Sequence, residues 1–181
     1  MQKSRLKNFR RNAIGTKRFN LNNYRSPILS TCAHPRPHIS HPIMISTETK
    51  IRVRYADTDQ MKMVYHTKYL EYFEQGRSDL LREIGLPYPE IEKMGYYLPV
   101  IEAHAKFLKA GRYDELLTVR TMLTEIPQVR VNIEYAIINE ESQELLVAGY
   151  TVHGFVDAKI GKPIRPPERF LEMVNKHFQK K

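Results

Sequence analysis

The sequence predicts an α+β domain in which one long central helix is wrapped by a curved antiparallel sheet and a further helix closes the chain. Three observations support this fold class. An amphipathic segment, residues 66–84, follows a short strand-like run; four long strand-like runs come after it; and residues 166–181 carry the signals of a terminal helix. Because helices and sheets each have an apolar side, the two are expected to pack together around one core.

The first two elements are read from hydrophobic periodicity. Residues 50–55 (KIRVRY) alternate basic and apolar side chains, which is typical of a half-buried strand. In residues 66–84 the apolar side chains recur at three- and four-residue steps, which predicts a helix. The helix is expected to end at Gly85, with Pro87 just beyond. Gly76 lies in its middle, where glycine costs about 1 kcal/mol relative to alanine, so we expect the helix to approach the sheet closely there.

The remaining elements follow in order. Residues 87–95 predict one short helical turn, and the four strand-like runs are residues 97–110, 114–126, 129–140 and 144–157. Short breaks between them predict hairpin-type, antiparallel neighbours. In residues 166–181, prolines at the start, Glu168 in the first turn and lysines at the end predict a helix. Such long strands have edges that need a cover, so we expect a homo-oligomer.

Residues 1–43 differ in composition from the rest of the chain. The sequence holds 29 Lys and Arg against 20 Asp and Glu, and the first acidic residue is Glu48. The basic surplus therefore lies in the N-terminal segment, and the balanced remainder, residues 44–181, does not suggest a nucleic-acid-binding domain. We expect residues 1–43 to be a disordered extension. A transit peptide, a nucleic-acid or membrane arm, and an extension without function all stay open.

Two simple features concern the cellular setting. The chain has one cysteine, Cys32, so no disulfide can form within it. No run approaches the roughly 18 apolar residues of a membrane span. We therefore expect a cytoplasmic protein, or an organellar one if residues 1–43 are a transit peptide.

Three stretches carry a resemblance to a known family: RYADTDQMKMVYHTKYLEYFEQGRSDLLREIG (54–85), LPVIEAHAKFLKAGRYDELLTVRT (98–121) and GYTVHGFVDAKIGKPIRP (149–166). They resemble the hotdog-fold thioesterases, in particular the acyl-CoA thioesterase group that includes 4-hydroxybenzoyl-CoA thioesterase and the YbgC proteins. The resemblance covers residues 50–165. It implies a hotdog fold, hydrolysis of an acyl-CoA without a cofactor, and a homodimer or homotetramer whose active site lies between subunits.

The resemblance also implies site residues. The catalytic carboxylate of the family falls on Asp59, as nucleophile or general base, and the amide that holds the thioester carbonyl falls on His66 at the helix start. The neighbouring substrate-binding positions are Tyr55, Met63, Val64 and Tyr65, and Met61, Tyr96 and Tyr97 are further candidates for the acyl pocket. Lys62 stands where the family usually has glycine, which puts the shape of the loop in question.

The residue types suit thioester hydrolysis. A helix N-terminus presents unpaired N–H groups to a developing oxyanion, and a carboxylate can attack the carbonyl or activate water. Coenzyme A also brings phosphates, which need basic partners. The candidates for this are Lys106, Arg130, Lys159, Lys162 and Arg165, which could equally be solvated surface charges.

Other polar residues have structural interpretations. Asp57 is expected to be structural, paired with Arg54 or with a helix residue, and Glu74 with Arg77 is read as an ion pair on the helix. His104 and His153 fall on strands and are expected to be core or interface residues. A metal site is not expected. The functions that stay open beside acyl-CoA hydrolysis are an acyl-carrier-protein thioesterase and a non-catalytic acyl-binding hotdog subunit.

Overall fold

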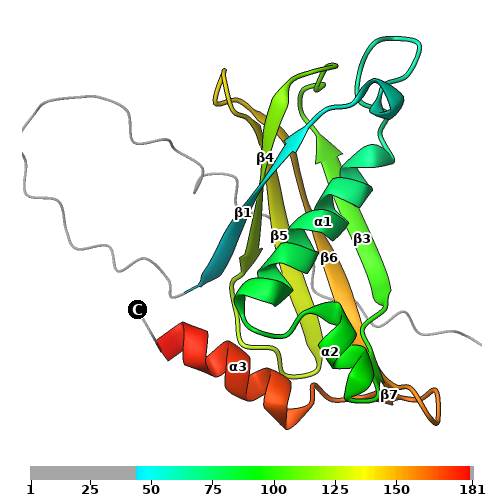
Figure 1. Ribbon diagram of the computed structural model, residues 1–181, viewed down its shortest axis with the longest axis vertical. Coiled ribbons are helices and arrows are strands. Elements are labelled where there is room, and N and C mark those ends of the chain that lie inside the picture. Colours follow the sequence, from blue (N-terminus) through cyan, green and yellow to red (C-terminus); the bar gives the residue numbers. More distant parts are fainter. Residues whose placement is uncertain (1–43, 180–181) are drawn as a thin grey trace, which may run out of the picture. The chain divides into compact units, whose positions relative to one another are not determined.

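A computed structural model describes residues 44–179 of the chain (Figure 1). The expectations for residues 1–43 fall outside this range. The strands are β1 Ile45–Arg52, β2 Tyr96–Tyr97, β3 Val100–Phe107, β4 Leu116–Leu123, β5 Arg130–Asn139, β6 Leu145–Asp157 and β7 Pro163–Ile164. The helical elements are the 3₁₀ turn η2 Tyr55–Asp57 and the α-helices α1 Lys68–Glu83, α2 Tyr88–Lys93 and α3 Glu168–Gln179.

The strands form one antiparallel sheet in which the long strand β6 pairs with β2, β3, β5 and β7. β1 pairs with β4, β4 with β5, and β5 with β6. On its other side β6 pairs with β3 and, near its end, with β2, while β7 also pairs with its last residues. The helix α1 crosses one face of this sheet, as Figure 1 shows. An α+β fold with a long helix on an antiparallel sheet is thereby confirmed.

One predicted neighbour relation is wrong. The runs 97–110 and 114–126 were expected to form a hairpin, but β3 pairs with β6 and lies away from β4. Both sides of β4 are already taken, by β1 and β5. The connection from β3 to β4 instead runs beside the segment before α1, where the Val64 amide donates to the Gly111 carbonyl at 2.8 Å. The short segment between β3 and β4 therefore connects two strands that are not neighbours in the sheet.

The close approach of α1 to the sheet is confirmed at Gly76. A Cβ at this position would lie 2.3 Å from Thr121 Oγ1 and 3.0 Å from Val119 Cγ1, both on β4. Nearby, the ring of Phe73 stacks on that of Tyr135 of β5, with ring centroids 4.3 Å apart. Glycine allows the helix backbone to sit directly on the strand, and the stacked rings fill the core beside it.

The helix ends are also close to the expected ones. α1 begins at Lys68, two residues later than expected, and Gly85 follows its end with a φ of +82°, the left-handed conformation that glycine favours. The short α2 forms as expected. The terminal helix α3 packs through Phe170, whose ring meets Phe155 of β6.

The predicted Glu74–Arg77 ion pair is wrong. Within residues 44–179 no ion pair joins these two side chains, and Arg77 is 94% buried because its side chain turns into the core rather than along the helix surface. There it interacts with the hydroxyl groups of Tyr88 and Tyr135. His153 is a core residue, as expected. His104 is exposed on β3, where its ring stacks on that of Tyr150.

Candidate active site

The segment between η2 and α1, residues 58–67, folds as a small hairpin that we call the 58–67 loop. Thr58 and Val64 form an isolated antiparallel bridge. The Asp59 amide donates to the Met63 carbonyl and the Lys62 amide donates to the Asp59 carbonyl, both at 2.9 Å. Asp59 therefore lies on the first arm of the hairpin, and His66 follows the second arm at the entrance to α1.

Lys62 forms the turn of this hairpin in the left-handed conformation, with a φ of 58°. Glycine adopts this conformation without cost, whereas other residues pay roughly 1–2 kcal/mol. The loop thus has the backbone shape that a glycine would support, with a lysine side chain added on its exposed surface.

The Asp59 carboxylate is half-buried and oriented by the loop backbone. Its Oδ1 accepts hydrogen bonds from the Met61 amide at 2.8 Å and the Met63 amide at 3.3 Å. Within the described chain Oδ2 accepts no hydrogen bond. One carboxylate oxygen is therefore held in place while the other is free for a ligand.

The start of α1 offers an unpaired donor. The Tyr65 amide donates to Asp57 O and the Lys68 amide donates to Tyr65 O, both at 2.8 Å, whereas the intervening Thr67 amide, like that of His66, has no acceptor among the described residues. In residues 44–179 the His66 amide donates to no acceptor. Its imidazole is exposed and lies edge-on to the Tyr65 ring, with centroids 4.4 Å apart. A free N–H at a helix N-terminus, in the positive field of the helix, can bind a carbonyl oxygen that gains negative charge.

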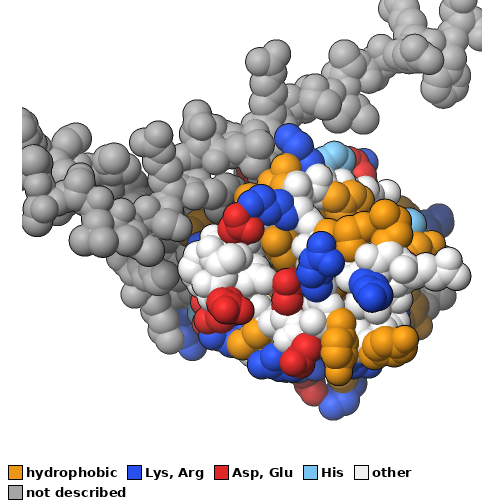
Figure 2. Space-filling view, turned by 90° about the horizontal axis from the view of Figure 1, so that it is seen from above, with side chains coloured by type: hydrophobic (Ala, Val, Ile, Leu, Met, Phe, Trp, Pro, Cys, Tyr) orange, Lys and Arg blue, Asp and Glu red, His pale blue; other side chains and the backbone are white. Residues whose placement is uncertain are grey.

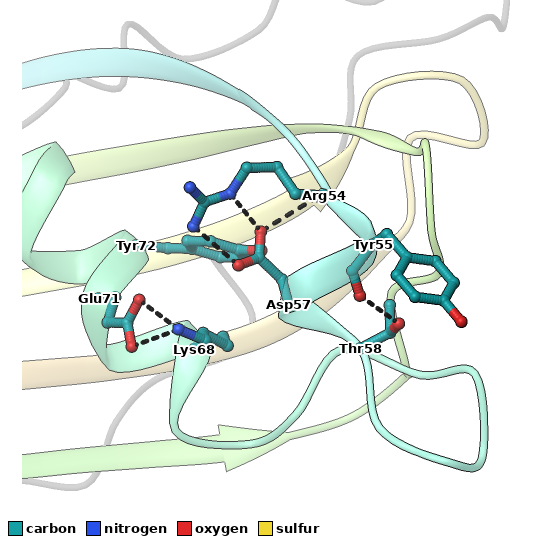
Figure 3. Close-up of polar contacts among 7 residues, drawn as sticks. All are labelled: Arg54, Tyr55, Asp57, Thr58, Lys68, Glu71 and Tyr72. Atoms are coloured by element: carbon teal, nitrogen blue, oxygen red, sulfur yellow. Dashed lines mark hydrogen bonds and ion pairs between the residues drawn. The ribbon is translucent and has the colours of Figure 1, made fainter.

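Asp57 pairs with Arg54 and with a helix residue, as the sequence suggested (Figure 3). Its carboxylate receives the Arg54 side chain through Nε at 3.1 Å and a terminal nitrogen at 2.9 Å, and the Tyr72 hydroxyl at 3.2 Å. The hydrogen bond from the Arg54 side chain lowers the pKa of the Asp57 carboxyl, so Asp57 is an anion. Burial and the Asp57 charge raise the pKa of Tyr72, whose hydroxyl therefore keeps its proton.

The expected substrate-binding side chains differ in their exposure. Tyr55 is 80% exposed in η2, and its ring meets that of Tyr113 edge-on. Tyr65 is exposed and Met63 is half-buried, but the Val64 side chain packs in the core, so Val64 can meet a ligand only through its backbone. Figure 2 looks onto this end of the domain, where hydrophobic side chains lie among basic ones.

The expected acyl-pocket side chains outside the loop lie apart from it. Tyr96 and Tyr97 form β2 and pair with Asp157 and Val156, at the far end of β6. Met61 is exposed in the 58–67 loop. The structure therefore groups Met61 with the catalytic candidates and separates the two tyrosines from them within one chain.

The expected phosphate-binding residues are also split between the two ends of the sheet. Lys106 pairs with Ala148, towards the end where the 58–67 loop lies. Arg130 pairs with Gly154, and Lys159, Lys162 and Arg165 surround the β6–β7 hairpin at the opposite end (Figure 1). One chain alone does not bring these four basic residues to the loop.

The hydroxyl groups of Tyr69 and Tyr72 support the loop, and the sequence pattern did not single them out. The Gly111 amide donates to the Tyr69 hydroxyl at 2.9 Å, which ties the β3–β4 connection to α1. Tyr72 was missed because an aromatic residue on the buried face of a helix has no distinguishing pattern. The one feature that could have pointed to Tyr72 is chemical: its hydroxyl can donate a hydrogen bond to a buried carboxylate such as that of Asp57.

Among the described residues there is no cluster of three or more His, Cys, Asp or Glu able to hold a metal.

Comparison with known proteins identifies the family. The family model described as the Thioesterase-like superfamily matches residues 53–174, which include the 58–67 loop and all of α1. The chain belongs to this superfamily. Among the described residues of this thioesterase-like chain, no helix is long and apolar enough to cross a membrane.

Relatives in the superfamily match most of the chain. The YneP protein of Bacillus subtilis (strain 168) is 34% identical over 119 residues, 66% of this chain and 86% of that protein. The acyl-CoA thioesterase YbgC of Helicobacter pylori (strain ATCC 700392 / 26695) is 30% identical over 133 residues, 70% of this chain and 98% of that protein. The crystal structure of DHNA-CoA thioesterase from Staphylococcus aureus superposes with a TM-score of 0.67 at 31% identity, covering 75% of this chain and 89% of that one. The expected hotdog thioesterase fold is thereby confirmed.

Proposed function

We propose that this protein is an acyl-CoA thioesterase that hydrolyses an acyl-CoA to a carboxylic acid and free coenzyme A, through a domain of residues 44–181. The observation that carries the proposal is the 58–67 loop, which holds a carboxylate oxygen without a partner and leads to an unpaired N–H at a helix start. The similarity to an acyl-CoA thioesterase over 98% of its length supports the choice of substrate class.

In the proposed mechanism the thioester carbonyl oxygen accepts a hydrogen bond from the His66 amide. As the carbonyl carbon is attacked, negative charge develops on that oxygen, and a preorganised donor can lower the barrier by roughly 2.7–4 kcal/mol. Asp59 acts through its free oxygen in one of two ways. It either attacks the carbon to give an anhydride that water then hydrolyses, or it removes a proton from the attacking water. In both routes the C–S bond breaks and coenzyme A leaves as the thiolate.

We further propose that the active enzyme is at least a dimer joined through β3. This strand pairs with β6 on one side, and most of its residues are exposed, including Val100, Ile101 and Phe107. Two copies of β3 related by a two-fold axis would run antiparallel and cover each other's edges. This arrangement would bring the β6–β7 hairpin of one subunit towards the 58–67 loop of the other. Lys159, Lys162 and Arg165 could then meet the phosphates of the coenzyme A held by the partner.

The test of function is thiol release by the full chain from short, long and aromatic acyl-CoAs. Activity that is lost in Asp59→Asn while acyl-CoA binding remains supports hydrolysis and contradicts a purely acyl-binding protein. His66→Pro removes the amide proton, whereas His66→Ala keeps it. We expect a 10²- to 10³-fold loss of kcat in His66→Pro and a much smaller loss in His66→Ala.

Two outcomes would redirect the proposal. Equal losses in both His66 variants would move the role from the amide to the imidazole. No release from any acyl-CoA, with release from an acyl-carrier protein, would assign the same chemistry to a carrier-protein substrate.

We propose a cytoplasmic location, with an organelle as the alternative if residues 1–43 act as a transit peptide.

A further inference from the structure

We propose that Asp57 and Tyr72 are positioning residues that hold Asp59 and the His66 amide in register; this proposal rests on the function proposed above. Asp57 is 99% buried although it carries a charge. Its carboxylate accepts four hydrogen bonds, from the Arg54 amide and both ends of the Arg54 guanidinium fork, and from the Tyr72 hydroxyl (Figure 3). A buried carboxylate with this many donors is rigidly oriented.

Asp57 touches both parts of the proposed catalytic apparatus. Through the chain it is two residues from Asp59. Its carbonyl accepts the amide of Tyr65, the residue just before His66, at 2.8 Å. Its carboxylate meets Tyr72, which belongs to the same helix that His66 precedes. One residue thus links the arm that carries the carboxylate, the arm that carries the donor, and the helix behind them.

In the contact between Tyr72 and Asp57 the donor and the acceptor are fixed. Tyr72 is 96% buried, and its pKa is raised by burial and by the Asp57 charge, so the hydroxyl always donates to Asp57. The other partner, Arg54, has a side chain that is 71% exposed, so water can replace it. The hydroxyl of Tyr72 is therefore the only side-chain donor that ties Asp57 to α1 within the described residues. Losing it leaves Asp57 with donors from Arg54 alone and removes its side-chain link to α1, which lets the 58–67 loop shift relative to the helix.

A similar hydrogen bond far from the candidate site serves as a control that distinguishes a positioning role from a general contribution to stability. The Thr49 hydroxyl of β1 donates to the Asp79 carboxylate of α1 at 2.6 Å, and Thr49 is 94% buried. It also joins α1 to the strand side of the core through a hydroxyl and a carboxylate, but Asp79 lies near the far end of the helix from His66. Tyr72→Phe and Thr49→Val each remove one such hydroxyl with little change of shape.

The experiment compares the full-length wild type with Tyr72→Phe, Asp57→Asn and Thr49→Val for kcat, KM and Tm. We expect Tyr72→Phe to lower kcat by roughly 10-fold or more, because small displacements of reacting groups have large effects on rate, while KM changes less than about 2-fold. Thr49→Val is expected to lower Tm comparably and to keep kcat within about 2-fold of the wild type. Equal kcat in Tyr72→Phe and Thr49→Val would overturn the proposal. If Asp57→Asn does not fold, Tyr72→Phe still decides the question.

Amide hydrogen exchange gives a readout that does not need activity. We expect the Met61, Met63 and Tyr65 amides to exchange faster in Tyr72→Phe than in Thr49→Val, since these three amides hold the loop. Unchanged exchange would overturn the positioning role. A wild type that releases no thiol, together with faster exchange in Tyr72→Phe, would instead contradict the proposed function and leave the loop-holding role in place.

Discussion

His153 lies in the core of the sheet with no exposed surface, among groups that disfavour its charge. Its Nε2 is 2.8 Å from the Thr151 hydroxyl, which in turn is 2.8 Å from the Tyr135 hydroxyl. Arg77 of α1 faces the same region, together with Tyr88 of α2. Burial, followed by the repulsion from Arg77, lowers the pKa of His153 to about 4. The neutral imidazole is therefore the form that the fold accepts.

This predicts a specific loss of stability in mild acid. In the unfolded chain the histidine titrates near pH 6.5, so between pH 6.5 and 4 the unfolded state binds one more proton. The free energy of unfolding should thus be at its full value above pH 6.5 and fall as the pH falls towards 4, by up to roughly 3 kcal/mol. Urea unfolding across this range should show a steeper decline for the wild type than for His153→Gln. Parallel curves would contradict the prediction; acid groups such as Glu90 and Glu140, whose pKa values are lowered, act equally in both proteins.

At the scale of elements, the contact of α1 with β4 depends on the missing side chain of Gly76. In an exposed helix, Gly→Ala stabilises by about 1 kcal/mol. Here the added Cβ would stand 2.3 Å from Thr121 Oγ1, so the helix has to move away from the strand. We expect Gly76→Ala to lower the free energy of unfolding by about 1–3 kcal/mol, as overpacking does, measured by urea denaturation.

The control for Gly76 uses the facing residue. The Thr121 hydroxyl is buried and makes no hydrogen bond among the described residues, so Thr121→Ala removes the clash without breaking a bond. The Gly76→Ala cost should be smaller in the Thr121→Ala background, which a double-mutant cycle measures. A stabilising Gly76→Ala would show that helix propensity, rather than contact with the sheet, governs this position.

The sequence allowed the elements to be predicted better than their neighbours. Periodicity and end signals are local, so α1, α2, α3 and the long strands could be located within a few residues. The placement of β3 beside β6 rests on pairing between residues about 40 to 50 positions apart in the chain, from Val100 with His153 to Phe107 with Val147, which no local pattern encodes. The residues of the candidate site also fall into those that the sequence predicts and those that only the structure reveals. Asp59 and His66 stand out through a resemblance, whereas Tyr72 becomes visible only when its hydroxyl is seen against Asp57.

At the scale of the whole molecule, the distribution of charge and exposed apolar surface bears on assembly. The basic residues around the β6–β7 hairpin lie at the opposite end of the sheet from the 58–67 loop. A monomer would leave them distant from its own site. The exposed strand β3 runs between the two ends of the sheet. Antiparallel pairing of β3 with a second copy would place the β6–β7 hairpin of one subunit beside the 58–67 loop of the other. Assembly and substrate binding should therefore depend on the same strand.

This dependence is tested by placing a charge on the β3 edge. Ile101 is 52% exposed on β3, and Ile126, which is 44% exposed in the β4–β5 turn, is the matched control away from that edge. We expect the wild type to sediment as a dimer or larger. Ile101→Asp should shift it towards the monomer and raise KM for acyl-CoA, because the partner's basic residues are lost, while Ile126→Asp should leave the oligomeric state unchanged. A wild type that is monomeric at assay concentration and still releases thiol would contradict the shared site. Dissociation of Ile101→Asp without any change of KM would keep the dimer but remove the partner from phosphate binding.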